Sequence, residues 1–251
     1  MIGFFLAATL AHAQSFDAGS YFNAAAQTAT AAAASPLDLL VESNSYVPPF
    51  YLGRPLASPG SSIVAQAIAH FTDQSGNAVP DSSINFTWKI NGEVQGQLSG
   101  AGKSSAILPA PPLFGSETIE ADAQGSGAYG TASETLSAQD PQPLLYQDHP
   151  LYGIEYYDAL GGQSRIGDSE ATFAAVPYFV AAGGPNDRNL QWTWVVNGQS
   201  VPATSSASSE ITINAGGSAQ VSLGVSLVSS ANPLLDGQGQ WGILFAPTGL
   251  Q

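Results

Sequence analysis

The chain has 251 residues and a mass of 25.7 kDa, with 19 acidic residues, 5 basic residues, 3 His and no Cys, which gives a formal net charge of −14. So few cations argue against nucleic-acid binding, and the lack of Cys excludes disulfides, thiolate metal sites and a cysteine nucleophile. With 44% apolar and 10% aromatic residues, the chain has enough apolar side chains to fold around a core.

The first residues have the pattern of an export signal. Ile2–Leu10 is a short apolar run that ends in Ala11-His12-Ala13, an A-x-A cleavage pattern. The run is too short to span a bilayer, which takes roughly 20 residues. We therefore predict a signal peptide at residues 1–13 and a secreted or cell-surface protein, with the periplasm as the alternative location. We expect no membrane span after cleavage. The other interpretation of the run is a buried N-terminal strand or helix.

Residues 14–36 are rich in Ala, the best helix former, and Pro36 would end a helix there. This segment predicts a short helix, with a low-complexity stalk as the alternative.

From Leu37 onward the pattern is that of strands and turns. Apolar and polar residues alternate over 84–90 and again over 190–196, as in half-buried strands. Each run is followed by Asn-Gly, at Asn91 and Asn197, the dipeptide that favours a two-residue hairpin turn. The two runs lie 106 residues apart (197 − 91), which indicates an internal repeat.

The repeat extends to other segments. Residues 63–71 correspond to 171–179, and the Leu pair at 39–40 corresponds to the pair at 144–145. We therefore predict an all-β chain with two domains at residues 37–141 and 142–251. The segment Asp140 to Pro150 is predicted to be a short linker between them. A single large β-sandwich is the alternative.

Each predicted unit has the size and rhythm of an immunoglobulin-like sandwich of about seven short strands. Such sandwiches place a core Trp on their third strand, and the Trp strands here contain Trp88 and Trp194. We expect both side chains in the core, together with Phe71 and Phe179 at the end of the preceding strand.

The repeated Trp strands also support a family resemblance. Phe-Thr-Trp-Lys-Ile-Asn-Gly at 86–92 and Trp-Thr-Trp-Val-Val-Asn-Gly at 192–198 resemble the third strand and turn of bacterial immunoglobulin-like and PKD-type extracellular domains. The stretch 39–56 looks like the start of tandem domains of this kind in secreted bacterial proteins. The resemblance implies an extracellular module used in adhesion or as a spacer, and it implies no catalytic residues.

Motifs for chemistry are weak. G-x-G-x-x-G occurs at 125–130 and 237–242, but each match lies between strand-like segments, so we interpret these glycines as turn residues at equivalent places rather than as a nucleotide site. His70 and His149 lack the neighbours of a nucleophilic site. We therefore predict no catalytic residue and no cofactor. Calcium at the domain junction is a minor alternative, because acidic residues gather there in the sequence: Asp140, Asp148, Glu155, Asp158, Asp168 and Glu170.

Two aromatic segments are the candidate contacts for a protein or glycan partner at the cell surface. Their residues are Tyr46, Phe50, Tyr51, Tyr152, Tyr156 and Tyr157. The alternative is that these segments form first strands and pack against the sandwiches or at the junction.

Together these patterns predict a non-enzymatic exported structural or adhesion module. Two other functions stay open. A carbohydrate-binding module should show an exposed coplanar row of aromatic rings, whereas a periplasmic assembly or chaperone-like factor should show an open apolar sheet edge that accepts a partner strand.

Overall fold

The computed structural model describes residues 35–202 and 208–247, and the residues from Ser35 onward belong to one compact unit. The predicted signal peptide at 1–13 lies outside the described residues, and so does the Ala-rich segment as far as residue 34. Within the described part, regular structure is β throughout apart from the 3-10 turn η1 (Asp81–Ser83). This confirms the predicted all-β class.

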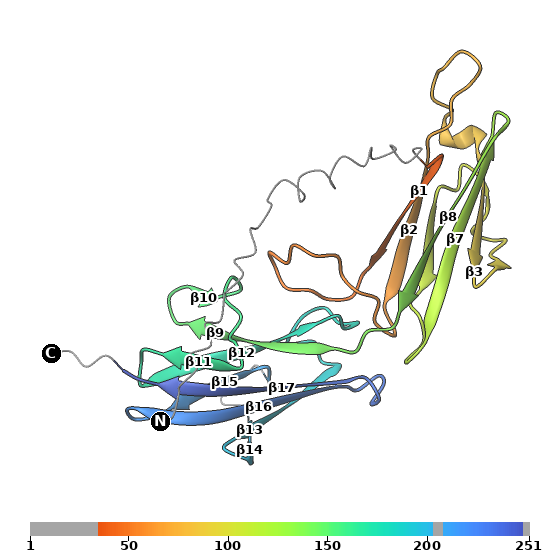
Figure 1. Cartoon of the computed structure of the whole chain (residues 1–251). Coiled ribbons are helices and arrows are strands. Elements are labelled where there is room, and N and C mark those ends of the chain that lie inside the picture. Colours follow the sequence, from red (N-terminus) through yellow and green to blue (C-terminus); the bar gives the residue numbers. More distant parts are fainter. Residues whose placement is uncertain (1–34, 203–207, 248–251) are drawn as a thin grey trace, which may run out of the picture. The chain divides into compact units, whose positions relative to one another are not determined.

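Eight strands form the first sandwich (Figure 1). They are β1 (Leu37–Ser43), β2 (Ser62–Ala69), β3 (Asn85–Ile90), β4 (Glu93–Val94), β5 (Gly100–Ala101), β6 (Ser105–Pro109), β7 (Ser116–Gly125) and β8 (Ala128–Ser137). One sheet has the order β1-β2-β6, and the other has the order β4-β3-β7-β8, with β5 paired to β3.

Within residues 142–202 and 208–247, nine strands form the second sandwich. They are β9 (Gln142–His149), β10 (Gly153–Ile154), β11 (Gln163–Ile166), β12 (Glu170–Tyr178), β13 (Leu190–Val196), β14 (Gln199–Val201), β15 (Glu210–Asn214), β16 (Ala219–Ser229) and β17 (Asp236–Phe245). Their two sheets have the orders β10-β9-β12-β15 and β11-β17-β16-β13-β14.

The two sandwiches repeat one strand order. Strands β9-β12-β15 correspond to β1-β2-β6, and β14-β13-β16-β17 correspond to β4-β3-β7-β8. Three strands facing four, nearly all antiparallel, is an immunoglobulin-like arrangement. The second sandwich adds β10 and the parallel strand β11. Whether the two sandwiches are separate folding domains stays a prediction.

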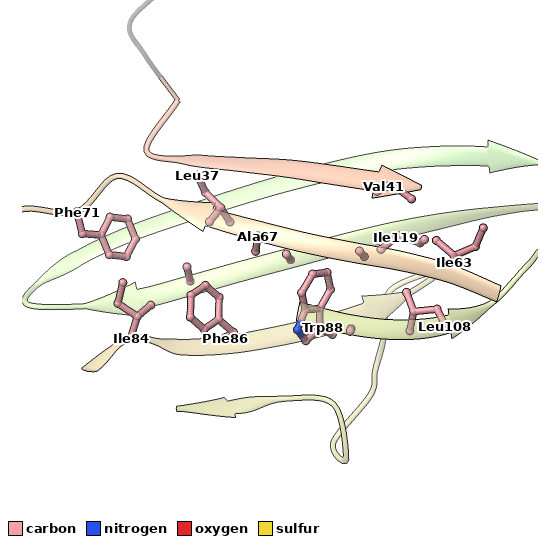
Figure 2. Close-up of a cluster of buried hydrophobic side chains, with 14 of the residues drawn as sticks. Leu37, Val41, Ile63, Ala67, Phe71, Ile84, Phe86, Trp88, Leu108 and Ile119 are labelled. Atoms are coloured by element: carbon pink, nitrogen blue, oxygen red, sulfur yellow. The ribbon is translucent and has the colours of Figure 1, made fainter. Parts of the chain in front are cut away.

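Apolar side chains from both sheets fill the first sandwich (Figure 2). Ile84, just before β3, and Phe86 and Trp88 on β3 point inward at alternate positions and are fully buried. The Trp88 indole N–H donates to the Lys103 carbonyl at 2.9 Å, so this large ring is buried with its polar atom satisfied.

The second core is built in the same way around Trp194, whose indole N–H donates to the Ser208 carbonyl at 2.9 Å. Phe179 differs from its counterpart Phe71. Phe71 packs in the core of the first sandwich, whereas Phe179 is buried in a separate aromatic cluster. Strand β12 ends at Tyr178, and Phe179 has a positive φ of 56°, which takes it out of the strand alternation.

Both predicted Asn-Gly turns have the backbone of a type I′ turn, with positive φ at Asn91, Gly92, Asn197 and Gly198. Each Asn side chain also accepts a backbone N–H at 2.9 Å from the neighbouring strand of the sheet, from Thr118 on β7 in the first sandwich and from Ser222 on β16 in the second. The Asn-Gly turn and the hydrogen bond to its Asn side chain are thus repeated together with the fold.

Two expectations are wrong. The segment Asp140 to Pro150 is not a linker, because residues 142–149 form β9, which pairs with β12 in the middle of a sheet. Of the two glycine motifs, only 125–130 spans a hairpin turn. Residues 237–242 lie inside β17, where a Cβ on Gly237 would approach the Pro141 carbonyl oxygen to 2.3 Å, so close backbone approach explains that glycine.

Candidate functional site

The loop between β1 and β2, residues 44–61, extends from the first sandwich to the second. Buried serines hold its base: Ser43 Oγ and Ser61 Oγ are 3.0 Å apart, and Ser45 Oγ donates to the Leu56 carbonyl at 2.6 Å. Pro48 and Pro49 follow and cannot donate to a strand ladder. These constraints let the loop leave the first sandwich without losing its attachment there.

Beyond its base, the loop is hydrogen-bonded to the end of β12. The Tyr46 N–H donates to the Val180 carbonyl at 2.7 Å, and the Phe179 N–H donates to the Tyr46 carbonyl at 2.8 Å. This two-bond bridge adds the loop to the second sandwich as an extended segment, which fixes the aromatic side chains beside it.

An aromatic cluster lies on the outward face of the β9–β12 sheet. Tyr146 follows Leu145 on β9, and neighbours on a strand point to opposite faces. Because Leu145 is in the core between the sheets, Tyr146 points outward. We call the rings that gather around it the tyrosine cluster, and its members are Tyr46, Tyr51, Tyr146, Tyr156, Tyr178 and Phe179.

The tyrosine cluster is held by ring contacts and one buried hydroxyl pair. The Tyr51 ring meets those of Tyr178 and Phe179 edge-on, with centroids 5.5 and 6.0 Å apart. The hydroxyls of Tyr146 and Tyr178 are 2.6 Å apart and buried. Edge-to-face pairs stabilise beyond their buried area, so the cluster contributes to the attachment of the loop.

Burial changes the acidity of these phenols. It raises the pKa of Tyr46 to about 12, with further contributions from nearby Tyr156 and Tyr178. Burial also raises the pKa of Tyr146, together with the hydrogen bond to Tyr178. The neutral phenols are therefore the forms that the folded cluster prefers.

The six predicted contact residues divide into two groups. Tyr46, Tyr51 and Tyr156 are half-buried in the tyrosine cluster. The side chains of the other three are open to solvent, with exposed fractions of 86% for Phe50, 78% for Tyr152 and 83% for Tyr157.

Tyr152 lies beside His149, and the two rings are stacked at 4.6 Å. The cluster members that sequence analysis missed are Tyr146, Tyr178 and, in this role, Phe179. For Tyr178 and Phe179 the signal was the unbroken run of apolar and aromatic residues over 173–179, which indicates burial on both faces of a strand.

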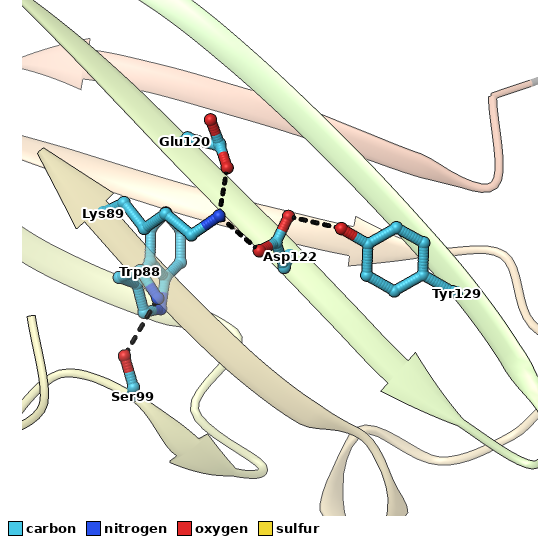
Figure 3. A network of polar contacts seen from close by, with 6 residues as sticks. All are labelled: Trp88, Lys89, Ser99, Glu120, Asp122 and Tyr129. Carbon is cyan, nitrogen blue, oxygen red and sulfur yellow. Dashed lines mark hydrogen bonds and ion pairs between the residues drawn. The ribbon is translucent and has the colours of Figure 1, made fainter. Parts of the chain in front are cut away.

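In the first sandwich, a network of charged side chains lies on the outer face of the sheet β4-β3-β7-β8 (Figure 3). Lys89 forms ion pairs with Glu120 and with Asp122, the latter at 2.7 Å, and the Tyr129 hydroxyl donates to Asp122 at 3.0 Å. The hydrogen bonds to both carboxylates raise the pKa of Lys89. For Asp122, burial acts in the opposite direction, but the hydrogen bonds from Lys89, Thr131 and Tyr129 together outweigh it and lower the pKa. Both groups are therefore held in their charged forms, which favours a structural role over nucleophilic or proton-transfer chemistry.

The acidic residues near the junction do not form a metal centre within the described residues, where no three His, Asp or Glu side chains gather closely enough to hold an ion. Asp148, Asp168 and Glu170 line one open cleft of about 460 Å³, and Glu170 accepts a bond from Asn214 at 2.6 Å. His70 is engaged elsewhere, 2.9 Å from Asp38. In the same described part, no helix is long and apolar enough to cross a membrane.

No known protein family matches the sequence, and no curated protein is similar to it. Among solved structures, the chain is similar to three N-terminal domains of the bacteriophage RB49 Highly Immunogenic Outer Capsid protein, at 12% identity and a TM-score of 0.37, over 84% of this chain and 59% of that one. It is similar to domains 4 and 5 of the S-layer protein SbsC at 12% identity and a TM-score of 0.33, over 83% and 98% of the two chains.

Fibronectin(III)-like modules of Clostridium thermocellum CbhA match at 12% identity and a TM-score of 0.28, over 84% of this chain and 97% of that one. Identities and TM-scores this low carry no argument about activity or partners. The immunoglobulin-like assignment therefore rests on the strand order of the chain itself.

Proposed function

We propose that this chain is a non-enzymatic structural or adhesion module, exported to the cell surface or the extracellular space, with the periplasm as the alternative. The observation that carries the proposal is the docking of the 44–61 loop on the second sandwich. A loop that leaves one sandwich and buries Tyr46 and Tyr51 on the other couples the two as a single structural element. Such coupling serves a spacer or a scaffold.

Replacing the docked ring tests this coupling. Tyr51→Ala removes the contacts with Tyr178 and Phe179, whereas Phe50→Ala, the matched control one residue earlier, removes a ring that is open to solvent. We expect Tyr51→Ala to speed proteolytic cleavage of the loop and hydrogen exchange at the end of β12 at least tenfold, with both cores still folded. Equal behaviour of the two variants would show that the loop does not couple the sandwiches.

Protease treatment of intact cells tests the location. Cleavage of residues 37–251 on intact cells, followed by mass spectrometry, is the expected result for a surface module. Protection until the envelope is opened would place the protein in an enclosed compartment and would favour an assembly factor.

Carbohydrate binding is a second candidate, favoured by the exposed Tyr152 ring stacked on His149 and by the exposed Tyr157. Aromatic faces of this kind contact sugars. Titration with soluble polysaccharides should then give binding that Tyr152→Ala abolishes and Phe114→Ala, at another exposed aromatic position, leaves unchanged. No binding by the unaltered chain would remove this candidate.

A further inference from the structure

The first sandwich has an open sheet edge where the second has a strand. In the second sandwich, β11 runs parallel to β17 and pairs along residues 163–166 with 242–245. In the first sandwich, β8 is the counterpart of β17, and among the described strands it pairs with β7 alone. The last third of β8 is therefore the place where a β11-like strand would lie.

The register of the two sandwiches can be matched at the Asn-Gly turns. The backbone N–H groups of Thr118 and Ser222 each donate to the Asn side chain of an Asn-Gly turn, so the two residues are equivalent. Thr118 pairs with Thr135 on β8, and Ser222 pairs with Gly242 on β17. Thr135 is therefore the counterpart of Gly242, whose N–H donates to the Gly162 carbonyl beside β11 at 2.9 Å.

A second pair of equivalent hydrogen bonds lies just after the ends of β8 and β17. The Gln139 N–H donates to the Ala57 carbonyl at 2.7 Å, and the Ala246 N–H donates to the Ile166 carbonyl at 2.9 Å. Gln139 and Ala246 are each four residues after the matched pair (139 − 135 and 246 − 242). The segment 54–57 therefore follows the course of β11, but only its last residue, Ala57, has a backbone hydrogen bond to the β8 side.

Pro55 explains why the segment stays apart from β8. In β11, alternate residues turn their backbone groups toward β17, and Ser164 is such a residue because it lies midway between Gly162 and Ile166. Two residues before Ala57, the place of Ser164 is taken by Pro55. A proline has no N–H to donate, so the ladder cannot continue there.

The gap between the segment and β8 is a cleft of about 270 Å³. Arg54–Ala57 forms one wall, Glu134–Ser137 forms the other, and Val41 and Ile63 lie at its base. Arg54 crosses the mouth, where it donates to the Val41 carbonyl at 3.2 Å and lies 3.4 Å from Glu134. The cleft is therefore apolar at its base and charge-balanced at its mouth.

The wall formed by β8 carries backbone groups that face the cleft. The Ala138 N–H donates to Gly115 on the β7 side, and the Gln139 N–H donates to Ala57 on the other side. Because backbone groups alternate between the two edges of a strand, those of Thr135 and Ser137 face the same side as Gln139.

We propose that this edge of β8 accepts an extended segment of a partner polypeptide as an added strand, which displaces the Ala57 carbonyl from the Gln139 N–H and lies beside β8 as β11 lies beside β17. The backbone of Thr135 and Ser137 supplies the affinity, and one aliphatic side chain of the partner fills the cleft over Val41 and Ile63. The β11–β17 contact in the same chain shows the chemistry of the occupant: an extended segment that buries one Ile, Ile166, and leaves its charged residue, Arg165, exposed to solvent. The proposal goes beyond the structural role and does not depend on the coupling of the two sandwiches.

The test uses the full chain and a capped synthetic peptide with the sequence of residues 161–167, which contains β11. Added to isotope-labelled protein, the peptide should shift the amide signals of Thr135, Ser137 and Gln139. A control peptide with Ile166→Asp should bind at least tenfold more weakly. No shift at millimolar peptide would overturn the proposal, and so would shifts at Gly242, which would mean exchange with β11 in the second sandwich.

Two variants place the binding at the edge. Thr135→Pro removes an N–H that faces the cleft and should weaken binding at least tenfold. Ser133→Pro removes an N–H on the same edge outside the cleft and should leave binding unchanged. If Thr135→Pro fails to fold, Pro55→Ser decides: it restores the missing donor, so the segment should close on β8, slow exchange at Thr135 and abolish peptide binding. Unchanged binding in Pro55→Ser would contradict the proposal.

Discussion

The two sandwiches share a strand order but differ on the outward face of the three-stranded sheet. In the second sandwich, five outward positions of β9 and β12 are apolar or aromatic and lie buried or half-buried: Leu144, Tyr146, Ala174, Val176 and Tyr178. In the first, the corresponding positions are mixed, and most are open to solvent: Asp38, Leu40, Gln66, Ile68 and His70.

This difference shows that the core residues specify the sandwich, whereas the outward residues decide what covers it. A strand with one solvent-exposed face alternates buried and exposed residues, as β2 largely does, whereas a strand covered on both faces is buried along most of its length, as β12 is from Phe173 to Tyr178. The covered face is then available for the 44–61 loop. A chain can thus repeat one fold and change its contacts by altering every second residue of a strand.

The largest expected effect on stability comes from replacing an outward residue of the second sandwich by Ala and comparing it with the equivalent replacement in the first. Tyr178→Ala removes a buried ring from the tyrosine cluster and should lower the free energy of unfolding by about 3 kcal/mol. His70→Ala, at the equivalent place in the first sandwich, removes a half-exposed ring paired with Asp38 and should cost less than about 1 kcal/mol. Urea unfolding monitored by tryptophan fluorescence measures both. Equal losses would show that the two faces are energetically alike.

A smaller effect is expected from the buried hydroxyl pair. Tyr146→Phe leaves the Tyr178 hydroxyl without its 2.6 Å partner and should cost about 1–2 kcal/mol. The double variant Tyr146→Phe with Tyr178→Phe removes both hydroxyls and should recover part of that loss, because no buried polar atom then lacks a partner. A double-mutant cycle on unfolding free energies checks this, and simple additivity would refute the coupling.

Much of the fold could be predicted from local sequence. The alternation over 84–90 and the Asn-Gly turns identify strands and hairpins because they depend on neighbouring residues only. The residues of β9 were wrongly predicted to be a linker, because Pro143 and Pro150 suggest irregular backbone. In the structure, Pro143 lies opposite Pro177 in the pairing of β9 with β12. Such tolerance depends on the partner strand, which the local sequence does not show.

The tyrosine cluster could be predicted only in part. Tyr46 and Tyr51 were singled out as aromatic residues on a proline-stiffened segment, but the side they bury depends on β12, far along the chain. The open edge of β8 was not predictable at all, because it depends on the register of Pro55 against a strand distant in sequence. The periodicity of apolar residues predicts strands, but it does not show which segments distant in the sequence contact one another.

Alkaline pH should lower the free energy of unfolding through the tyrosine cluster more than through tyrosines that are exposed to solvent. Tyr46 ionises near pH 10 when unfolded and at about 12 when folded, so between these values the unfolded chain binds fewer protons and stability falls as pH rises. The loss assigned to Tyr46 is on the order of 1 kcal/mol after solvent screening. Unfolding measured between pH 8 and 11 should show a shallower decline for Tyr46→Phe than for the unaltered chain. Tyr152→Phe, at a solvent-exposed tyrosine, is the control and should leave the slope unchanged; equal slopes for both variants would contradict the assignment.

The smallest expected change in stability lies at the tip of the loop. Phe50 has a positive φ of 66°, a backbone region that strains a residue with a side chain, and its ring is exposed. Phe50→Gly should therefore relieve strain and leave the unfolding free energy within about 0.5 kcal/mol of the original, because the more flexible unfolded chain offsets the gain. A loss of more than about 1 kcal/mol would show that the Phe50 ring packs in solution. If stability holds while a partner interaction is lost, the strained ring is retained for binding, and the contrast between Phe50 and its docked neighbour Tyr51 separates the surface that recognises from the surface that couples.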